Sequence, residues 1–561
     1  MNITGGKLVA KALQKNEIKL TFGLVGNHLS PIFVYLQDYG IRLIDVRHEQ
    51  AAVLMADGFA QVERKPAVAM VVGGPGFTNA ISGIVKAYMA NTPMLVILGA
   101  PIQTKKDKGS LQDMEQIQMI KPYTKWAASI QSAERIPEYI NMALQRAVSG
   151  RRGPVVLEIP INVLKSEVEE NQVIWPHYQA PIYDSCLGEK AIEKIVSILK
   201  QAKNPIVIAG DEVYYNNAEN ELVSFIERSR IPVFTVNKAR GCIPDKHSLC
   251  FGNGRILEAG FCMYAYSRAD CILNLGVYSN YEMGFYEPPI FSNDATMITI
   301  VQEPEQCTAQ NGNDGFTARG SMMLTLQALT KAVKENNYSC SSEWVKQLEK
   351  QNKLFWEDIL NNQVHKEKVN PVQLISTIQN IIPEDSIIIL DGSNSMFWGS
   401  LLFTCNHPGQ IIIAPDGTFG AMGGGLPLAL SAKIANDEKT VILYTGDGSF
   451  GFNMAEIDTA IRWNIKVVTV IHNDRAWGFC KATQEASYGE EKVAYVDLQN
   501  GNYEKIVEAA GGYGDLVETN DEIDKSLKAA LISNSFACLN VIVDEKMQAL
   551  GALSFNESLK K

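Results

Sequence analysis

Two carboxylates stand directly after two apolar runs in the last third of the chain. Asp447 lies in the glycine turn 446–449 (GDGS), which follows the run 441–444 (VILY), and Asp474 follows the β-branched run 466–471. Apolar residues recur at helical spacing between the two runs, so the stretch predicts a strand–helix–strand unit of a parallel sheet. Ligands bind at the carboxyl ends of such strands, and two carboxylates there suit a hard cation such as Mg²⁺.

The same glycine turn predicts an anion site beside the metal. Its backbone N–H groups and the N-terminus of the following helix favour a phosphate carried on the cation. The competing interpretation is the dinucleotide site of a nicotinamide or flavin oxidoreductase, because Gly446, Gly448 and Gly451 match GxGxxG after a strand. Asp447 argues against it, since a bare carboxylate repels a pyrophosphate unless a divalent cation lies between them. A purely structural turn is the third interpretation.

The pattern GDGS followed by ND resembles the cofactor signature of the thiamine-diphosphate-dependent enzymes. Asp474 lies 27 residues after Asp447, the spacing between the two side-chain Mg²⁺ ligands of that family. The resemblance implies thiamine diphosphate and Mg²⁺ as cofactors, with Asp447, Asp474 and the main-chain oxygen of Ala476 as metal ligands. The family usually has Asn where this chain has Asp474, so Asn473 is the alternative ligand.

A glutamate begins a predicted helix in the first domain. Residues 48–59 (HEQAAVLMADGF) follow the predicted strand 41–46, and on local sequence alone Glu49 only complements the helix dipole. The segment is similar to the one that carries the activating glutamate of thiamine-diphosphate enzymes. The resemblance implies that the Glu49 carboxyl hydrogen-bonds the aminopyrimidine ring and favours the imino tautomer, whose nitrogen removes the C2 proton of the thiazolium.

Two further catalytic candidates rest on the resemblance. His28, in the turn after the predicted strand 21–25, falls where benzaldehyde lyase has an active-site histidine. Gln112, in the polar segment 105–113, falls at an active-site glutamine of acetolactate synthases and benzaldehyde lyase. The alternative interpretations are a helix-capping His28 and a solvated loop glutamine.

The resemblance places the other cofactor contacts on turns of the last third. The turn after the predicted strand 385–390 suits a diphosphate, the Gly420 carbonyl accepts from the exocyclic amine, and Met422 enforces a bent cofactor. Without the family, the turn would equally be an ordinary capped helix start, and Met422 would be core filler. The implied cofactor-binding residues are Glu49, Gly392, Ser393, Asn394, Ser395, Gly420, Met422, Gly446, Asp447, Gly448, Ser449, Asp474, Ala476, Trp477 and Gly478.

The elements that position these residues repeat at the two ends of the chain. Residues 66–100 have the same strand, glycine turn (GGPG), helix and strand as 440–471, but lack the metal acids. We predict an α/β fold of three doubly wound parallel-sheet domains. They are a pyrimidine-binding domain (1–165), a central domain (188–335) and a diphosphate- and Mg²⁺-binding domain (366–548), and FAD in the central domain is not favoured.

The composition excludes several classes of protein. The 561 residues are 46% hydrophobic and 20% charged with a net charge of −11, which gives no sign of a nucleic-acid or membrane partner. No apolar run is long enough for a membrane helix, and the N-terminus lacks the apolar core of a secretory signal. The ten cysteines are scattered without a CxxC pair, which is typical of reduced thiols in a cytoplasmic protein.

The resemblance is to the subgroup of acetolactate synthase and benzaldehyde lyase. The first expectation is decarboxylation of a 2-oxo acid such as pyruvate, with transfer of the acyl carbanion to an aldehyde or ketone acceptor. The alternative is reversible cleavage of 2-hydroxyketones, as in benzaldehyde lyase, which His28 and the segment 476–478 favour. Met396 and Asp416 weaken it, because benzaldehyde lyase has an aromatic residue and a histidine there.

The assembly follows from the position of the catalytic groups. Glu49 lies in the first domain and the metal acids lie in the third, and in the resembling family these domains meet across a subunit interface. We therefore expect a homodimer or homotetramer that acts on small molecules. A catalytically inactive binding subunit is a remaining alternative, against which the intact Glu49 and Asp447 argue.

Overall fold

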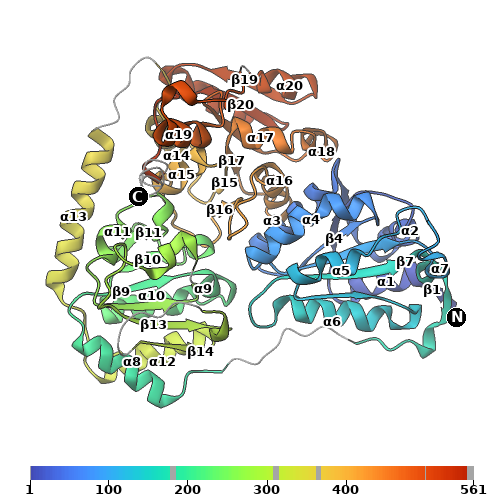
Figure 1. The fold of residues 1–561 in the computed structure, drawn as a ribbon, viewed down its shortest axis with the longest axis horizontal. Coiled ribbons are helices and arrows are strands. Elements are labelled where there is room, and N and C mark those ends of the chain that lie inside the picture. The colour runs from blue at the N-terminus through green and yellow to red at the C-terminus, as the bar shows by residue number, and fades with distance from the viewer. Residues whose placement is uncertain are drawn as a thin grey trace.

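The computed structural model describes residues 2–176, 185–258, 260–278, 280–307, 315–361, 368–499 and 501–551. It contains three six-stranded sheets in which every paired strand is parallel, and one antiparallel pair near the N-terminus. The predicted α/β class with three parallel-sheet domains is therefore confirmed (Figure 1). None of the helices in the described part of the chain is both long and apolar enough for a membrane span.

The first domain is built on buried apolar strands separated by helices. Its sheet has the order β3 (Arg42–Asp45), β2 (Leu20–Gly23), β4 (Ala67–Val71), β5 (Met94–Ala100), β7 (Pro154–Pro160) and β6 (Trp126–Ser129). Its helices are α1 (Gly5–Lys15), α2 (Ser30–Leu36), α3 (Glu49–Glu63), α4 (Pro75–Met89), α5 (Gln116–Ile120), α6 (Ile136–Val148) and α7 (Ile161–Lys165). The antiparallel pair joins β1 (Asn2–Thr4) to β8 (Glu167–Glu169).

The third domain repeats the topology of the first. Its sheet has the order β16 (Ile411–Ile413), β15 (Ile387–Asp391), β17 (Val441–Gly446), β18 (Val468–Asn473), β20 (Ala537–Ile542) and β19 (Tyr513–Val517). Its helices are α14 (Pro371–Ile381), α15 (Asn394–Leu402), α16 (Gly425–Ala435), α17 (Asp447–Phe452), α18 (Glu456–Arg462), α19 (Gly478–Tyr488), α20 (Tyr503–Ala509) and α21 (Ile523–Ile532). In both sheets the first strand along the chain lies between the second and the third, so the two ends of the chain share one architecture.

The central domain has a different strand order. Its sheet runs β11 (Cys250–Asn253), β10 (Val233–Thr235), β9 (Pro205–Ala209), β12 (Cys271–Leu275), β13 (Thr296–Val301) and β14 (Phe316–Arg319), the order of dinucleotide-binding domains. Its helices are α8 (Glu189–Gln201), α9 (Asp211–Tyr215), α10 (Glu219–Ser229), α11 (Cys262–Tyr266), α12 (Met322–Glu335) and α13 (Ser342–Asn361).

A carboxylate occupies the crevice where a dinucleotide would approach this central sheet. Glu212, just after β9, is buried and accepts hydrogen bonds from the Gln302 N–H (3.0 Å) and the Tyr278 hydroxyl (2.9 Å). A Cβ at Gly276, just after β12, would lie 2.6 Å from the Glu212 Cβ. The switch point is thus occupied by a buried acid, which agrees with a central domain in which FAD is not favoured.

The first and third domains share one hydrophobic core. Helix α3 packs on α16 between the two sheets, as Figure 1 shows near the centre of the molecule. The helices cross at Gly58, where a Cβ would lie 2.4 Å from Ser431 Oγ and 2.9 Å from Leu428 Cα. This close crossing fixes the first domain against the third within one chain.

All three domains meet at a buried lysine of the central domain. Lys238 Nζ donates to the Ala90 carbonyl of the first domain (2.8 Å) and pairs with Asp211 (3.3 Å) and with Asp416 of the third domain. Lys238 and Asp416 are both nearly inaccessible to solvent. Removing either one would leave the other as an unpaired buried charge, which is strongly destabilising. Asp416 directly precedes the loop 417–424, which holds two of the predicted cofactor contacts.

Candidate functional site

A pocket opens at the carboxyl ends of β15 and β17, where the strand order of the third sheet reverses. This is the position at which open α/β sheets bind ligands. Every predicted cofactor contact of the last third except Gly420 lines this switch-point pocket, and His472, Phe479 and Cys480 complete the lining. The pocket has a cavity volume of about 60 Å³.

Two buried carboxylates, Asp447 and Asp474, line this pocket and interact electrostatically. Asp447 is 3% exposed and Asp474 is 9% exposed. Within the described residues, Asp447 Oδ2 has no hydrogen-bond partner. Burial, with the charge of Asp474, raises the pKa of Asp447 to about 8, and burial raises the pKa of Asp474 to about 6. A divalent cation held by both would remove the repulsion and satisfy the free oxygen, so the residues fit the predicted Mg²⁺.

The structure favours Asp474 over Asn473 as the second metal ligand. The Asn473 side chain is already engaged, because it donates to Asn540 Oδ1 (2.9 Å) and accepts from the Arg475 N–H (2.9 Å). Asn473 is not part of the pocket lining, whereas Asp474 is. Ala476, whose main-chain oxygen is the third predicted ligand, lines the same pocket.

The turns around the carboxylates form a cradle for an oxyanion. Gly392 has a φ of 98°, and a Cβ there would lie 2.4 Å from Ser395 Oγ. A Cβ at Gly448 would lie 2.6 Å from the ring of Trp477. The Ser449 hydroxyl is buried and has no partner among the described residues. Free hydroxyl and backbone donors beside a cation site are the groups that a diphosphate requires.

Asp391 anchors the loop that carries Met422. Its carboxylate, at the end of β15, accepts from the N–H groups of Gly392 (2.7 Å), Gly423 (3.3 Å) and Gly425 (2.8 Å). Burial raises its pKa to about 6. The Asn453 amide also donates to the Gly423 carbonyl (2.6 Å), so the end of the loop near α16 is fixed.

Glu49 lies apart from the switch-point pocket of its own chain. It begins α3, is 7% exposed, and accepts a hydrogen bond from the Asn79 amide (2.9 Å). A Cβ at Gly76 would lie 3.2 Å from Glu49 Oε1, so the glycine turn 73–76 leaves room for the carboxyl. The lining of the switch-point pocket, for the residues described, comes from 392–480 alone.

His28 and Gln112 lie against the same region of the first domain. A Cβ at Gly99 would lie 2.5 Å from the His28 Cβ, and a Cβ at Gly74 would lie 2.7 Å from the Gln112 Cβ. His28 Nδ1 is buried without a described partner, and burial lowers the pKa of this imidazole. The three predicted catalytic residues therefore gather at the carboxyl end of the first sheet, around the turn 73–76.

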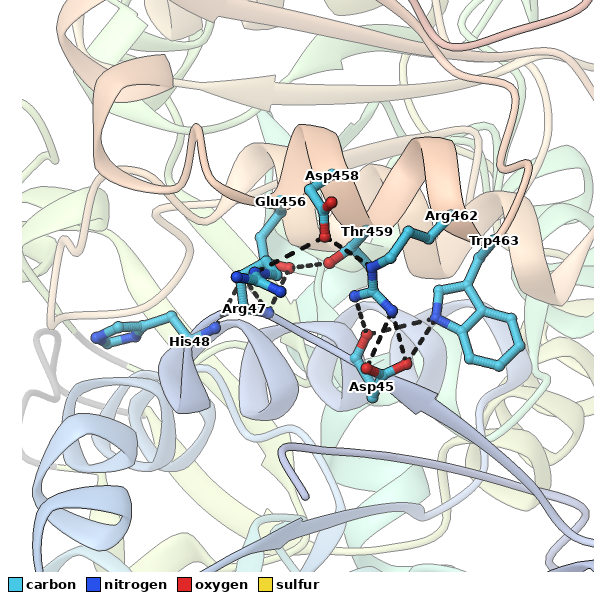
Figure 2. A network of polar contacts seen from close by, with 8 residues as sticks. All are labelled: Asp45, Arg47, His48, Glu456, Asp458, Thr459, Arg462 and Trp463. Atoms are coloured by element: carbon cyan, nitrogen blue, oxygen red, sulfur yellow. Dashed lines mark hydrogen bonds and ion pairs between the residues drawn. The ribbon is translucent and has the colours of Figure 1, made fainter. Parts of the chain in front are cut away.

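A glutamate of the third domain sets the start of α3. Glu456 accepts from the backbone N–H groups of Arg47 (3.1 Å) and His48 (3.1 Å), directly before Glu49, as Figure 2 shows. Arg462 of the same helix, α18, pairs with Asp45 (2.9 Å) at the end of β3. This network holds the β3–α3 turn, and with it Glu49, against the third domain.

Several residues of this site are not among those that the sequence predicted. Gln116 ties the first-domain turns together, because it accepts from the Gly74 N–H (3.1 Å) and donates to the Gly99 carbonyl (3.2 Å). Asp391 anchors the loop at the third sheet, and His472 lines the switch-point pocket. Asp391 carried the same signal as Asp447, a carboxylate after an apolar strand, whereas no local pattern marked Gln116 or His472.

A cation site and an oxyanion cradle at one switch point, with a buried glutamate on a second domain of the same topology, define a thiamine-diphosphate-dependent enzyme. Family models of the thiamine pyrophosphate enzymes match the chain in three parts. The N-terminal TPP binding domain matches residues 3–119, the central domain 192–329 and the C-terminal TPP binding domain 391–541.

Relatives that match over almost their full length show which group within this family the chain resembles. A probable acetolactate synthase of Mycobacterium bovis is 30% identical over 96% of this chain and 95% of its own length. An acetolactate synthase large subunit of Buchnera aphidicola is 31% identical over 94% and 92%. A 2-hydroxyacyl-CoA lyase of Arabidopsis thaliana is 28% identical over 97% and 96%. The chain belongs to the thiamine pyrophosphate enzyme family, in its acetolactate synthase-like group, and its cofactor is thiamine diphosphate.

Proposed function

We propose that this protein decarboxylates a 2-oxo acid such as pyruvate and transfers the acyl group to an aldehyde or ketone acceptor. The observation that carries the proposal is the pair Asp447 and Asp474, two buried carboxylates at the switch point with a free oxygen and an oxyanion cradle beside them. The full-length relatives named as acetolactate synthases support the reaction type.

Thiamine diphosphate supplies a nucleophilic carbon and an electron sink when it is bound. In our proposal Asp447, Asp474 and the Ala476 carbonyl hold Mg²⁺, and residues 392–395 and 446–449 hold the diphosphate. Met422, which accepts a hydrogen bond from the Ser393 hydroxyl at its sulfur (3.7 Å) and lines the pocket, would support a bent cofactor. Glu49, whose buried position excludes water, would hold a proton at the pyrimidine ring and so control its tautomer.

His28 and Gln112 serve the substrate in this proposal. Burial lowers the pKa of His28, so the imidazole is uncharged near pH 7 and can accept or donate one proton at its free Nδ1. Gln112 is half-buried beside the turn that borders Glu49, where its amide can orient a carbonyl or carboxylate.

We propose that the active site is completed by a second copy of the chain, in a homodimer or homotetramer. The separation of Glu49 from the switch-point pocket supports this assembly, since the two halves of the predicted site do not meet within one chain. A cytoplasmic location remains our prediction, supported by ten cysteines that are all free thiols.

The alternative activity is cleavage of a 2-hydroxyketone or a related 2-hydroxyacyl compound. The relative named as a 2-hydroxyacyl-CoA lyase matches 97% of this chain, at an identity close to that of the acetolactate synthases. The half-buried His28 also suits a lyase, which must deprotonate the substrate hydroxyl.

Pyruvate consumption by the purified protein tests the proposal, with Mg²⁺ and thiamine diphosphate present or withheld and products identified by NMR. We expect cofactor-dependent loss of pyruvate with appearance of acetolactate or acetoin. Binding of thiamine diphosphate without loss of pyruvate would overturn the proposed donor, and cleavage of acyloins in the same assay would establish the lyase instead.

A further inference from the structure

His472 is a buried histidine that faces the switch-point pocket without a described partner for one of its ring nitrogens. It lies on β18, two residues before Asp474, and is 2% exposed. Its Nδ1 lies 2.7 Å from the hydroxyl of Tyr444 on the neighbouring strand β17. Its Nε2 is buried and unpartnered in the described structure, and the residue lines the pocket beside Asp447 and Asp474.

The donors and acceptors of Tyr444 and His472 together determine the tautomer of His472. Tyr444 is fully buried, and its hydroxyl bonds His472. If the hydroxyl donates to Nδ1, the imidazole carries its proton on Nε2 and only one donor remains free. If Nδ1 donates instead, both the tyrosine proton and the Nε2 lone pair are left buried and unsatisfied. The first arrangement costs less free energy, so Nε2 is a fixed N–H donor.

We propose that the His472 Nε2–H donates a hydrogen bond to an oxygen of the bound diphosphate, and that Tyr444 positions this donor by holding Nδ1. The proposal rests on the cofactor assigned under the proposed function. The N–H lies in a pocket that offers a cation site and an oxyanion cradle, and a diphosphate is the ligand whose oxygens would satisfy it. The donor would be uncharged and permanently oriented, unlike a flexible lysine or arginine.

Two alternatives for the free nitrogen are less consistent with the structure. A role as metal ligand needs a lone pair on Nε2, which the bond from Tyr444 removes, and Mg²⁺ prefers oxygen ligands. A donor bond to Asp474 is absent, although both side chains line the pocket. A packing role alone would leave a buried donor unsatisfied, which costs free energy.

The experiment compares H472Q with H472N, because a glutamine amide reaches the position of Nε2 and an asparagine amide only that of Nδ1. Apoprotein, freed of metal by EDTA, is titrated calorimetrically with thiamine diphosphate and, separately, with inorganic pyrophosphate, both with Mg²⁺. We expect H472N to bind both ligands about tenfold to a hundredfold more weakly than wild type, and H472Q to bind them within about threefold. Y444F, which keeps the imidazole but frees its tautomer, should give an intermediate loss for both ligands.

Equal affinities of H472Q and H472N, at melting temperatures close to wild type, would overturn the proposal. So would a loss confined to thiamine diphosphate with pyrophosphate unchanged, because the bond would then not involve the diphosphate. H472N keeps the acceptor for Tyr444, so a loss of affinity in a folded H472N protein cannot come from that bond alone. If wild type binds both ligands but does not consume pyruvate, the proposed function fails while this inference stands.

Discussion

Asp447 and Glu49 are both buried acids, yet their surroundings prepare them for different tasks. Asp447 has a free oxygen, and the carboxylate of Asp474 also lines the pocket. Burial and the charge of Asp474 raise the pKa of Asp447 to about 8 in the absence of a cation. Glu49 instead accepts one hydrogen bond from Asn79, and the missing side chain of Gly76 leaves room beside its carboxyl. The first arrangement calls for a metal, and the second for a proton shared with a nitrogen base.

Replacing Glu49 by glutamine should separate catalysis from binding. We expect kcat for E49Q to fall about 10²- to 10⁴-fold, because an amide cannot hold the exchangeable proton, while the affinity for thiamine diphosphate stays within about threefold. Steady-state kinetics and calorimetric titration measure the two quantities. E63Q, at the other end of α3, is the matched control, and equal activity of E49Q and E63Q would refute the role of Glu49.

Replacing Asp447 by asparagine should have the opposite signature. D447N loses one charged metal ligand, so we expect its affinity for thiamine diphosphate in a Mg²⁺ titration to fall at least about tenfold. D437N, whose side chain is 95% exposed, controls for the loss of one negative charge. An affinity of D447N for thiamine diphosphate equal to that of wild type across the Mg²⁺ titration would count against the metal site.

At the residue scale, local patterns in the sequence predicted most of the switch-point pocket but not all of it. The turn 446–449 and Asp474 were predictable because strand ends, glycine turns and acids are adjacent in the chain. His472 was not, because its partner Tyr444 is set by the pairing of β17 with β18. Asn79 was missed for a similar reason, since it reaches Glu49 across the packing of α3 on α4.

At the scale of elements, α18 determines how α3 begins. Glu456 is fully buried and accepts the two N–H groups that precede Glu49. In E456A both amides would be left unsatisfied, at a cost of about 1–3 kcal/mol each. We expect a lower melting temperature and a lower kcat, with the affinity for thiamine diphosphate retained.

E456Q is the conservative partner of that variant. Its amide oxygen can still accept one N–H, so kcat should recover in part while the charge is removed. D458N, on the same helix, removes the exposed ion pairs to Arg47 and Arg462 but leaves the two amides bonded. If D458N and E456A lowered kcat equally, the start of α3 would not depend on Glu456.

The acid at the switch point of the central sheet should make stability depend on pH. Burial raises the pKa of Glu212 to about 7, above the unfolded value near 4.5. The stability that its protonated form contributes is fully present below pH 4.5 and is lost as pH rises through about 7. E212Q resembles the protonated acid at every pH, so we expect it to differ from wild type least near pH 5 and to exceed it by up to about 3 kcal/mol at pH 8.

Melting temperatures of both proteins from pH 5 to 8 measure this difference. E193Q serves as control, because Glu193 is exposed on α8 and the curves of E193Q and wild type should be parallel. A constant difference between E212Q and wild type across the range would show that Glu212 is ionised at all these pH values.

The sequence predicted the elements better than their contacts. The apolar runs at 441–444 and 466–471 became β17 and β18, and the similarity of 66–100 to 440–471 became two sheets of the same strand order. The contact of α3 with α16 was not predictable, because Gly58 and Leu428 belong to helices with ordinary apolar faces. Which two faces meet depends on three domains packing together, and no local spacing encodes that.

At the scale of the whole molecule, the separation of Glu49 from the switch-point pocket makes a complementation test decisive. If the first domain of one copy meets the third domain of another, a mixed dimer of E49Q and D447N has one intact site and one with both lesions. Random pairing of coexpressed variants should then restore about a quarter of wild-type activity. If each chain formed its own site, every site would carry one lesion and the mixture would stay inactive.

The core shared by α3 and α16 also has a consequence for synthesis. The face of α3 that includes Leu54 emerges from the ribosome long before its cover on α16 exists. At translation rates of about 5–20 residues per second, the ~370 residues between the two helices take roughly 20–75 s to make. During that time the nascent first domain exposes an apolar surface that is prone to association. Newly made chains are therefore the form of this protein most dependent on chaperones.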